Sequence, residues 1–366
     1  MSDFNPATKP APPGDPLPPV EPPSAAFLVQ LFLIPGLIVG VIVLVWVLFN
    51  WIAHSGSGDP RDYVEALRRN SPDVWLKAEI LAEMLGNDRR NELRGNPELA
   101  GELADILDQR IADGQMDKDS VNLRVYLSKA LGQFNTPVGL PALLKAATTN
   151  RDEAEMPVRR AALDAIGALA VNVQTANAAK AAQSTDATSG SRGSTASALS
   201  DPELMKTLLD ASHDPASVIR LRAAYVLGIV GGPQAIDRLD RMLDDPYPDV
   251  AYNAATGLAR HGDARSIDML ATMLAIDASS PALESEEKNL REGKRWAIVV
   301  NALRAVGQLA EANPSVDLSR VEPAVRAWQS PDASAASHVA EVPLEVREAA
   351  LAAGEAIQNR TSAEHR

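Results

Sequence analysis

From residue 59 onward, apolar residues recur with the spacing of one face of an α-helix. Two of these sets are Leu140, Leu143, Leu144 and Ala147, and Ile236, Leu239 and Leu243. Each set predicts a short amphipathic helix with a single apolar stripe. A three-turn helix with one stripe is not stable alone in water, so we expect these helices to pair and the pairs to stack.

One helix of each expected pair carries a repeated phrase, in which a basic residue is followed eight positions later by Gly. It occurs as Arg124 to Gly132, Arg159 to Gly167 and Arg220 to Gly228. The equivalent positions along the chain are Arg124, Arg159, Arg220, Ala251, Val299 and Arg347, separated by 35, 61, 31, 48 and 48 residues. Self-similarity at a period of 31–35 residues, lengthened by insertions, predicts a helical solenoid.

Asp-Pro and Gly residues mark where the helices begin and end. Asp-Pro occurs at 214–215 and 245–246, where Asp can cap the next helix and Pro suits its first turn. Gly231-Gly232 and Gly262 stand where a chain leaving a helix needs a positive φ. The resulting helices are predicted at 202–211, 217–229, 233–243 and 249–260.

The best-preserved unit reads Asp214-Pro215-x-x-Val218-x-Arg220-x-x-Ala223-Ala224-x-x-Leu227-Gly228-x-x-Gly231. This pattern resembles the HEAT-repeat family, including the shorter bacterial HEAT-like repeats. The resemblance implies an all-α solenoid of about six to seven helix pairs over residues 70–358, which binds proteins on its concave face. It also implies a structural ladder of side chains between repeats, at Arg124, Arg159, Arg220 and Arg347. Ala251 and Val299 depart from the pattern, so we expect the ladder to be interrupted there.

The N-terminal part has a different character. Residues 1–24 contain nine prolines and predict a disordered tail. Residues 27–53 are almost wholly apolar and lack charge, which predicts a transmembrane helix over 25–54 that contacts the lipid bilayer. Gly36 and Gly40 have the spacing of transmembrane packing motifs. A linker and a helix are expected at 55–69.

The basic residues on either side of the apolar run predict its orientation. One Lys precedes it, at Lys9, and three arginines follow it, at Arg61, Arg68 and Arg69. The positive-inside rule then places the repeat domain in the cytoplasm and the N-terminus outside, as a single-pass membrane protein.

Two further segments are predicted to lie outside the stacked helices. Residues 171–200 are rich in Ser, Thr, Ala and Asn, which is typical of a mobile surface insertion. Residues 359–366 are expected to form a disordered tail.

The composition of the chain limits the partners and the catalytic chemistry that we expect. The net charge is −13, which repels phosphate backbones and argues against nucleic acid as a partner. There is no cysteine, so disulfides, thiol catalysis and Cys-ligated zinc are excluded. The five histidines lie far apart in the sequence, and no phosphate-binding loop or calcium loop occurs. We therefore predict no catalytic residue, no cofactor and no metal site.

The anchor, the repeats and the lack of a catalytic cluster together predict a membrane-anchored, non-catalytic scaffold for protein–protein interaction. An acidic array favours a protein partner with a basic patch. Two alternatives remain open, a structural homo-oligomer at the membrane surface and an enzyme or small-ligand carrier with a site between repeats.

Overall fold

The computed structural model describes residues 33, 36–47, 60–69, 73–87, 91–183, 201–277, 279–284, 286–329 and 342–364. Its internal contacts divide the chain into two units, residues 1–59 and residues 60–366. All of the labelled helices belong to the second unit, and the described part of that unit is α-helical with short 3-10 turns.

In the second unit the helices associate in successive pairs, each made of a first and a second helix joined by a loop. The pairs are α2 (Pro60–Arg68) with α3 (Val74–Gly86), α5 (Pro97–Asp113) with α6 (Lys118–Gly132), α7 (Leu140–Thr148) with α8 (Met156–Gln183), α9 (Pro202–Ala211) with α10 (Ser217–Val230), α11 (Pro233–Met242) with α12 (Pro248–Arg260), α13 (Ile267–Leu274) with α14 (Arg291–Ala312), and α15 (Glu322–Gln329) with α17 (Leu344–Glu364). A short helix, α4 (Asn91–Arg94), lies between the first two pairs.

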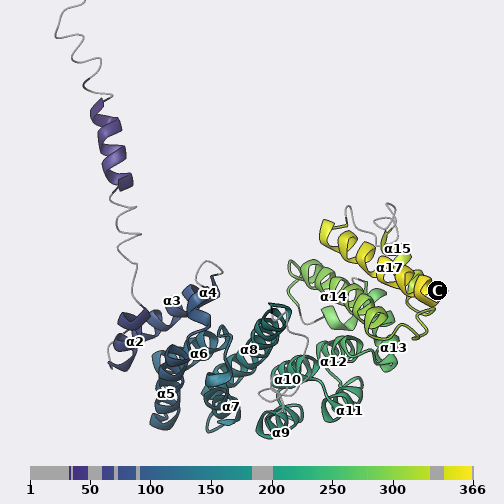
Figure 1. Ribbon diagram of the computed structural model, residues 1–366, viewed down its shortest axis with the longest axis horizontal. Helices are drawn as coiled ribbons and strands as arrows, with labels where there is room; N and C mark the ends of the chain where they lie inside the picture. The colour runs from purple at the N-terminus through teal and green to yellow at the C-terminus, as the bar shows by residue number, and fades with distance from the viewer. Residues whose placement is uncertain are drawn as a thin grey trace, which may run out of the picture. The chain divides into compact units, whose positions relative to one another are not determined.

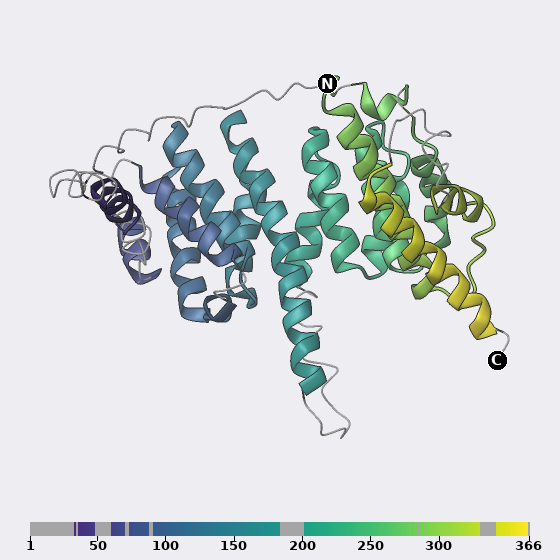
Figure 2. The same ribbon diagram turned by 90° about the horizontal axis from the view of Figure 1, so that it is seen from above.

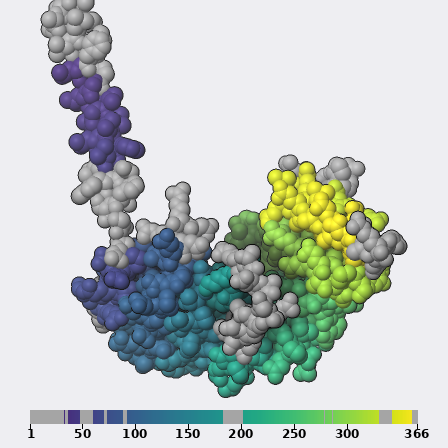
Figure 3. Space-filling model, viewed as in Figure 1, coloured from purple at the N-terminus to yellow at the C-terminus, as the bar shows by residue number. Residues whose placement is uncertain are grey.

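The pairs stack into two layers (Figure 1). The second helices form one layer, in which each of α3, α6, α8, α10, α12, α14 and α17 contacts the next. The first helices α5, α7, α9 and α11 contact one another in the other layer. The space-filling view shows the colours of the second unit following one another in sequence order (Figure 3). Contacts between consecutive repeats are what the period in the sequence predicts, and the all-α solenoid is confirmed.

Local sequence signals account for the helix ends. The Asp201 side chain accepts a hydrogen bond from the Glu203 backbone N–H at the start of α9, where Pro202 occupies the first turn. Gly231 and Gly262 leave α10 and α12 with φ of 68° and 74°, as their positions predict. The predicted boundaries of α9 to α12 therefore agree with the structure to within one residue.

The core lies between the two layers and is built from Leu, Val, Ile and Ala. Ala223 in α10 and Ala254 in α12 are completely buried, as are Leu227 and Leu258 one turn further along the same helices. Small side chains at these positions let neighbouring second helices approach closely. The Ala-rich, aromatic-poor composition of the chain serves this packing.

The predicted transmembrane helix over 25–54 is wrong. Among the residues that the structure describes, no helix is both long enough and apolar enough to cross a membrane. Within the apolar run, continuous helix is described over 36–47. The predictions of a single-pass location, of its orientation and of lipid contact through residues 27–53 depend on such a span. No described helix provides it.

Two segments are more helical than the sequence suggests. α8 continues to Gln183, well into the stretch read as an insertion from residue 171, and Figure 2 shows its last turns reaching beyond the neighbouring helices. Residues 171–183 are rich in Ala, the strongest helix former, and Val173 still packs in the core. Residues 184–200 lie outside the described residues. At the C-terminus α17 runs to Glu364, through most of the expected tail, and the Arg360 guanidinium donates a hydrogen bond to the Val316 carbonyl.

Candidate functional site

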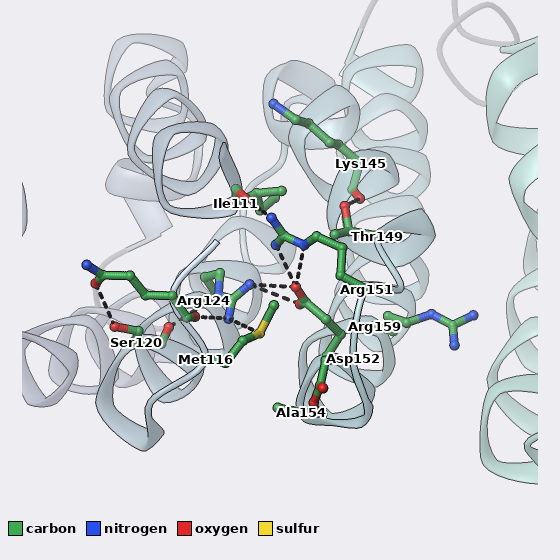
Figure 4. Close-up of polar contacts among 12 residues, drawn as sticks. Ile111, Met116, Ser120, Arg124, Lys145, Thr149, Arg151, Asp152, Ala154 and Arg159 are labelled. Atoms are coloured by element: carbon green, nitrogen blue, oxygen red, sulfur yellow. Dashed lines mark hydrogen bonds and ion pairs between the residues drawn. The ribbon is translucent and has the colours of Figure 1, made fainter. Parts of the chain in front are cut away.

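The repeat arginines occupy the joints between successive second helices. Arg124 of α6 is fully buried, and its Nη1 lies 3.1 and 2.9 Å from the two carboxylate oxygens of Glu155 (Figure 4). Glu155 ends the 3-10 turn Glu153–Glu155, which directly precedes α8. The Arg124 Nη2 donates to the Gln115 carbonyl at 2.7 Å. The carboxylate and the carbonyl together satisfy a charge that would otherwise be costly to bury.

A second arginine completes this joint. Arg151 Nε donates to Glu155 Oε1 at 3.0 Å, and its Nη1 donates to the Ile111 carbonyl of α5 at 2.8 Å (Figure 4). Glu155 therefore serves two guanidinium groups from different elements. Asp152, the carboxylate that the repeat pattern suggests for this place, instead caps the following 3-10 turn by accepting from the Ala154 N–H.

The next two joints have the Asp partner that the repeat pattern suggests. Arg159 of α8 forms an ion pair with Asp214, which precedes α10, and both side chains are about nine-tenths buried. Arg220 of α10 forms a two-bond contact with Asp245, which precedes α12, at 2.7 and 2.9 Å. Each Asp also accepts a hydrogen bond from the backbone N–H of the residue two positions later. One carboxylate therefore caps a helix and also pairs with the arginine of the preceding repeat.

Electrostatics at the Arg220–Asp245 joint follow from this geometry. Burial alone would raise the pKa of Asp245, but the hydrogen bonds from Arg220 and from the Tyr247 N–H outweigh it and lower that pKa. The hydrogen bond to Asp245 in turn raises the pKa of Arg220. Both shifts stabilise the charged pair, which is the role of a structural joint.

The ion pairs of the repeat arginines do not continue beyond α12 in the described part of the chain. Ala251 and Val299 cannot form ion pairs, and α12 is tied to α14 by Lys294, whose Nζ lies 2.9 Å from the Asp249 carboxylate and 3.1 Å from that of Glu286. Arg347 of α17 is exposed and forms no ion pair with a described residue. Gly36 and Gly40 have no atom within 4 Å of an added Cβ among the described residues.

A groove on the exposed side of the second-helix layer offers the candidate binding site. Two adjoining cavities of about 210 and 240 Å³ lie along α10, α12 and α14. They share three lining residues, Asn253, Thr256 and Asn301. We call these two cavities the groove. Its lining includes hydroxyl, amide and charged side chains besides apolar surface, and a groove of this kind can hydrogen-bond a polypeptide.

The groove residues hold equivalent places in the repeat. Asn253 and Asn301 stand two positions after Ala251 and Val299, and Thr256 and Arg304 stand five positions after them. The same places in α10 hold Arg222 and Tyr225. The repeat phrase in the sequence does not mark these residues, because it consists of the buried positions. Their signal in the sequence is that they stand between the buried positions of each second helix.

Histidine and acidic side chains form no candidate metal site in the described part of the chain. No group of three or more His, Asp or Glu side chains there could hold a metal ion. The His261 ring lies 2.9 Å, through Nε2, from the Gly228 carbonyl at the end of α10. The His213 ring lies 2.8 Å, through Nδ1, from the Leu209 carbonyl of its own helix pair. Both rings thus sit at carbonyls that helix ends leave free.

Comparison with known proteins agrees with the repeat architecture. The family model described as PBS lyase HEAT-like repeat matches residues 219–245, which cover most of α10 and α11. No curated protein matches the chain. The match has about the length of one repeat, and it runs from the second helix of one pair to the first helix of the next.

Solved structures similar to the chain include both designed and natural proteins. A designed armadillo repeat protein is 15% identical, with a TM-score of 0.34, and the match covers 82% of this chain and all of that one. An engineered protein is 14% identical, with a TM-score of 0.34, over 83% of this chain and 98% of that one. Human deoxyhypusine hydroxylase is 16% identical, with a TM-score of 0.29, over 82% and 96%. At these identities the likeness concerns the fold alone.

Proposed function

We propose that the chain is a non-catalytic protein-interaction scaffold that docks a segment of a partner protein in the groove along α10, α12 and α14. The observation that carries the proposal is the groove itself, where side chains of three successive repeats are presented together. Repeat solenoids commonly use such extended surfaces for binding.

Unpaired polar groups in the groove support this proposal. Asn301 and Gln308 of α14 are exposed, and neither side chain hydrogen-bonds to a described residue. Asn253 donates through Nδ2 to the Leu221 carbonyl at 3.1 Å, which orients its amide across the groove wall. Oriented and unpaired amides suit the backbone of an extended segment, which presents both donors and acceptors.

The arrangement of the two cavities suits a protein segment, because two small cavities adjoin across three repeats. Pockets for drug-sized ligands usually enclose about 300–1,000 Å³ and bury most of the ligand. The two cavities of the groove, at about 210 and 240 Å³, are each smaller than that and adjoin along the stack. A chain lying across the second helices would occupy both.

The net charge of −13 bears on how the partner arrives. A field of this sign favours encounter with a partner whose surface is basic overall, since long-range attraction raises the association rate. The docked segment itself meets only the side chains that line the groove, and its chemistry is decided there.

Photo-crosslinking tests the docking surface. A photoreactive amino acid placed at 301 should capture one stoichiometric partner from cells, and the same probe at Gln234, an exposed residue of α11 in the other layer, should not. The partner should also be retained by Gln234→Trp and lost with Asn301→Trp, which fills the groove. Equal capture at both positions, or retention by both variants, would place the interaction elsewhere and contradict the proposal.

A further inference from the structure

The charged residues that line the 240 Å³ cavity of the groove are all basic. They are Arg260 of α12 and Arg304 of α14, and no Asp or Glu lines this cavity. The adjoining 210 Å³ cavity differs, since Asp249 stands there beside Arg222 and Lys294. One half of the groove is therefore locally positive on a chain whose net charge is −13.

The cations of the two cavities also differ in how they are paired. Lys294 is held by Asp249 and Glu286, and Arg222 Nε lies 2.8 Å from Asp164 Oδ1. Arg260 is exposed and forms no ion pair with a described residue. Arg304 Nη2 lies 3.0 Å from Glu345 Oε1 at the start of α17, and these two side chains are 57% and 65% exposed.

An ion pair with this exposure is weak and easily exchanged. Surface pairs of Arg with Glu contribute at most about a fivefold change in an equilibrium, because water and salt screen them. A ligand carboxylate that reaches both Arg260 and Arg304 meets two guanidinium groups, each with planar N–H donors suited to carboxylate oxygens. Such a ligand can displace Glu345 from Arg304.

We propose that the positive half of the groove binds an acidic, extended segment of the partner protein, and that Glu345 competes with this segment for Arg304. The inference rests on the proposed docking function and names the chemistry of the docked segment. Carboxylates of the segment pair with Arg260 and Arg304. Asn301 and Gln308 stand three positions before and four positions after Arg304 on the same face of α14, and their amides hydrogen-bond the segment's backbone.

Fluorescence anisotropy with the full chain tests the proposal. The probe is a labelled peptide of alternating Glu and Gly, with a Gln/Gly peptide of the same length as its neutral match. We expect the Glu peptide to bind about tenfold more tightly than the Gln peptide, and its affinity to fall as salt rises. Arg260→Gln and Arg304→Gln should each weaken it about threefold.

Glu345→Gln tests the role of the carboxylate that pairs with Arg304. Removing the competing carboxylate should strengthen binding of the Glu peptide about twofold to threefold, with no effect on the Gln peptide. Arg241→Gln, an exposed arginine of α11 in the other layer, is the matched control and should change neither. Because Arg304 and Glu345 are both largely exposed, these variants should keep the melting temperature of the parent.

Three results would overturn the inference. The first is equal binding of the Glu and Gln peptides, and the second is weaker binding of the Glu peptide after Glu345→Gln. The third is displacement of the Glu peptide by an equal concentration of inorganic phosphate at constant ionic strength, which would identify a site for small anions. If these occur while the crosslinked partner is still captured at 301, the docking function stands and only the acidic specificity falls. If capture at 301 also fails, both proposals fall.

Discussion

Gly228 of α10 faces Gly257 of α12 so closely that a Cβ added to Gly228 would lie 2.7 Å from the Gly257 Cα. The contact joins backbone to backbone, so neither helix can yield by turning a side chain. An equivalent contact joins α6 to α8, where a Cβ on Gly132 would lie 2.8 Å from the Ala165 Cα. The Gly of the repeat phrase is thus the place where successive second helices touch.

Gly228→Ala should therefore destabilise the solenoid. The added methyl gains about 0.5–1 kcal/mol of helix propensity, but overpacking a rigid contact costs about 1–3 kcal/mol, so the net effect is a loss. Gly293→Ala in α14 is the matched control, because an added Cβ there meets nothing within 4 Å and only the gain should remain. Urea unfolding measures both, and a gain in stability for Gly228→Ala would contradict the close approach of α10 and α12.

Glu155→Gln should be among the most damaging single substitutions in the array. It leaves the fully buried Arg124 and its neighbour Arg151 without their shared carboxylate, and an uncompensated buried charge costs about 3–5 kcal/mol. Asp268→Asn is the comparison, since the Arg320–Asp268 pair is 64% and 80% exposed and should matter by less than about 1 kcal/mol. Thermal unfolding distinguishes the two. Similar melting temperatures would mean that the Arg124 joint adds little to stability.

Stability should depend on pH through Asp245. Its pKa in the folded chain is lowered, because the hydrogen bonds from Arg220 and Tyr247 outweigh the effect of burial. The unfolded chain then binds the proton more readily, so the stabilisation is complete above the unfolded pKa of about 3.9 and is lost as pH falls through the folded pKa. The difference in unfolding free energy between the parent and Asp245→Asn should shrink below about pH 4.

Asp164 provides a contrast of opposite sign. Burial raises its pKa, and the nearby Arg222, Arg160 and Lys129 offset this only in part. The folded chain therefore takes up that proton more readily than the unfolded chain, and acidification through this range favours folding. A pH series in urea in which Asp245→Asn and Asp164→Asn shift the slope in the same direction would disprove this assignment.

Sequence alone predicted what depends on local chemistry. The stripes, Asp-Pro caps and Gly stops located α9 to α12 to within one residue, because each signal acts over a few neighbouring positions. The groove depends on α12 stacking against α14, and its matching residues Asn253 and Asn301 are separated by an insertion in the sequence. The position of Glu155 beside Arg124 depends on a 3-10 turn that the repeat pattern does not show. The membrane span was predicted from a run of apolar side chains, and among the described residues no helix is both long and apolar enough to cross a membrane.

The C-terminal half of α8 allows a direct test of the mobile insertion that composition predicted there. A mobile insertion from residue 171 would tolerate the loss of any apolar side chain. In the structure, Val173 is 3% exposed, whereas Val171, two positions earlier on the same helix, is 41% exposed. Val173→Ala should cost about 1.5–2 kcal/mol for two buried methyl groups, and Val171→Ala should cost less than about 0.5 kcal/mol. Because the two substitutions are chemically identical, helix propensity and unfolded-state effects cancel between them. Equal urea midpoints would show that α8 does not pack beyond residue 171, and a lower midpoint for Val173→Ala alone would place these turns in the core.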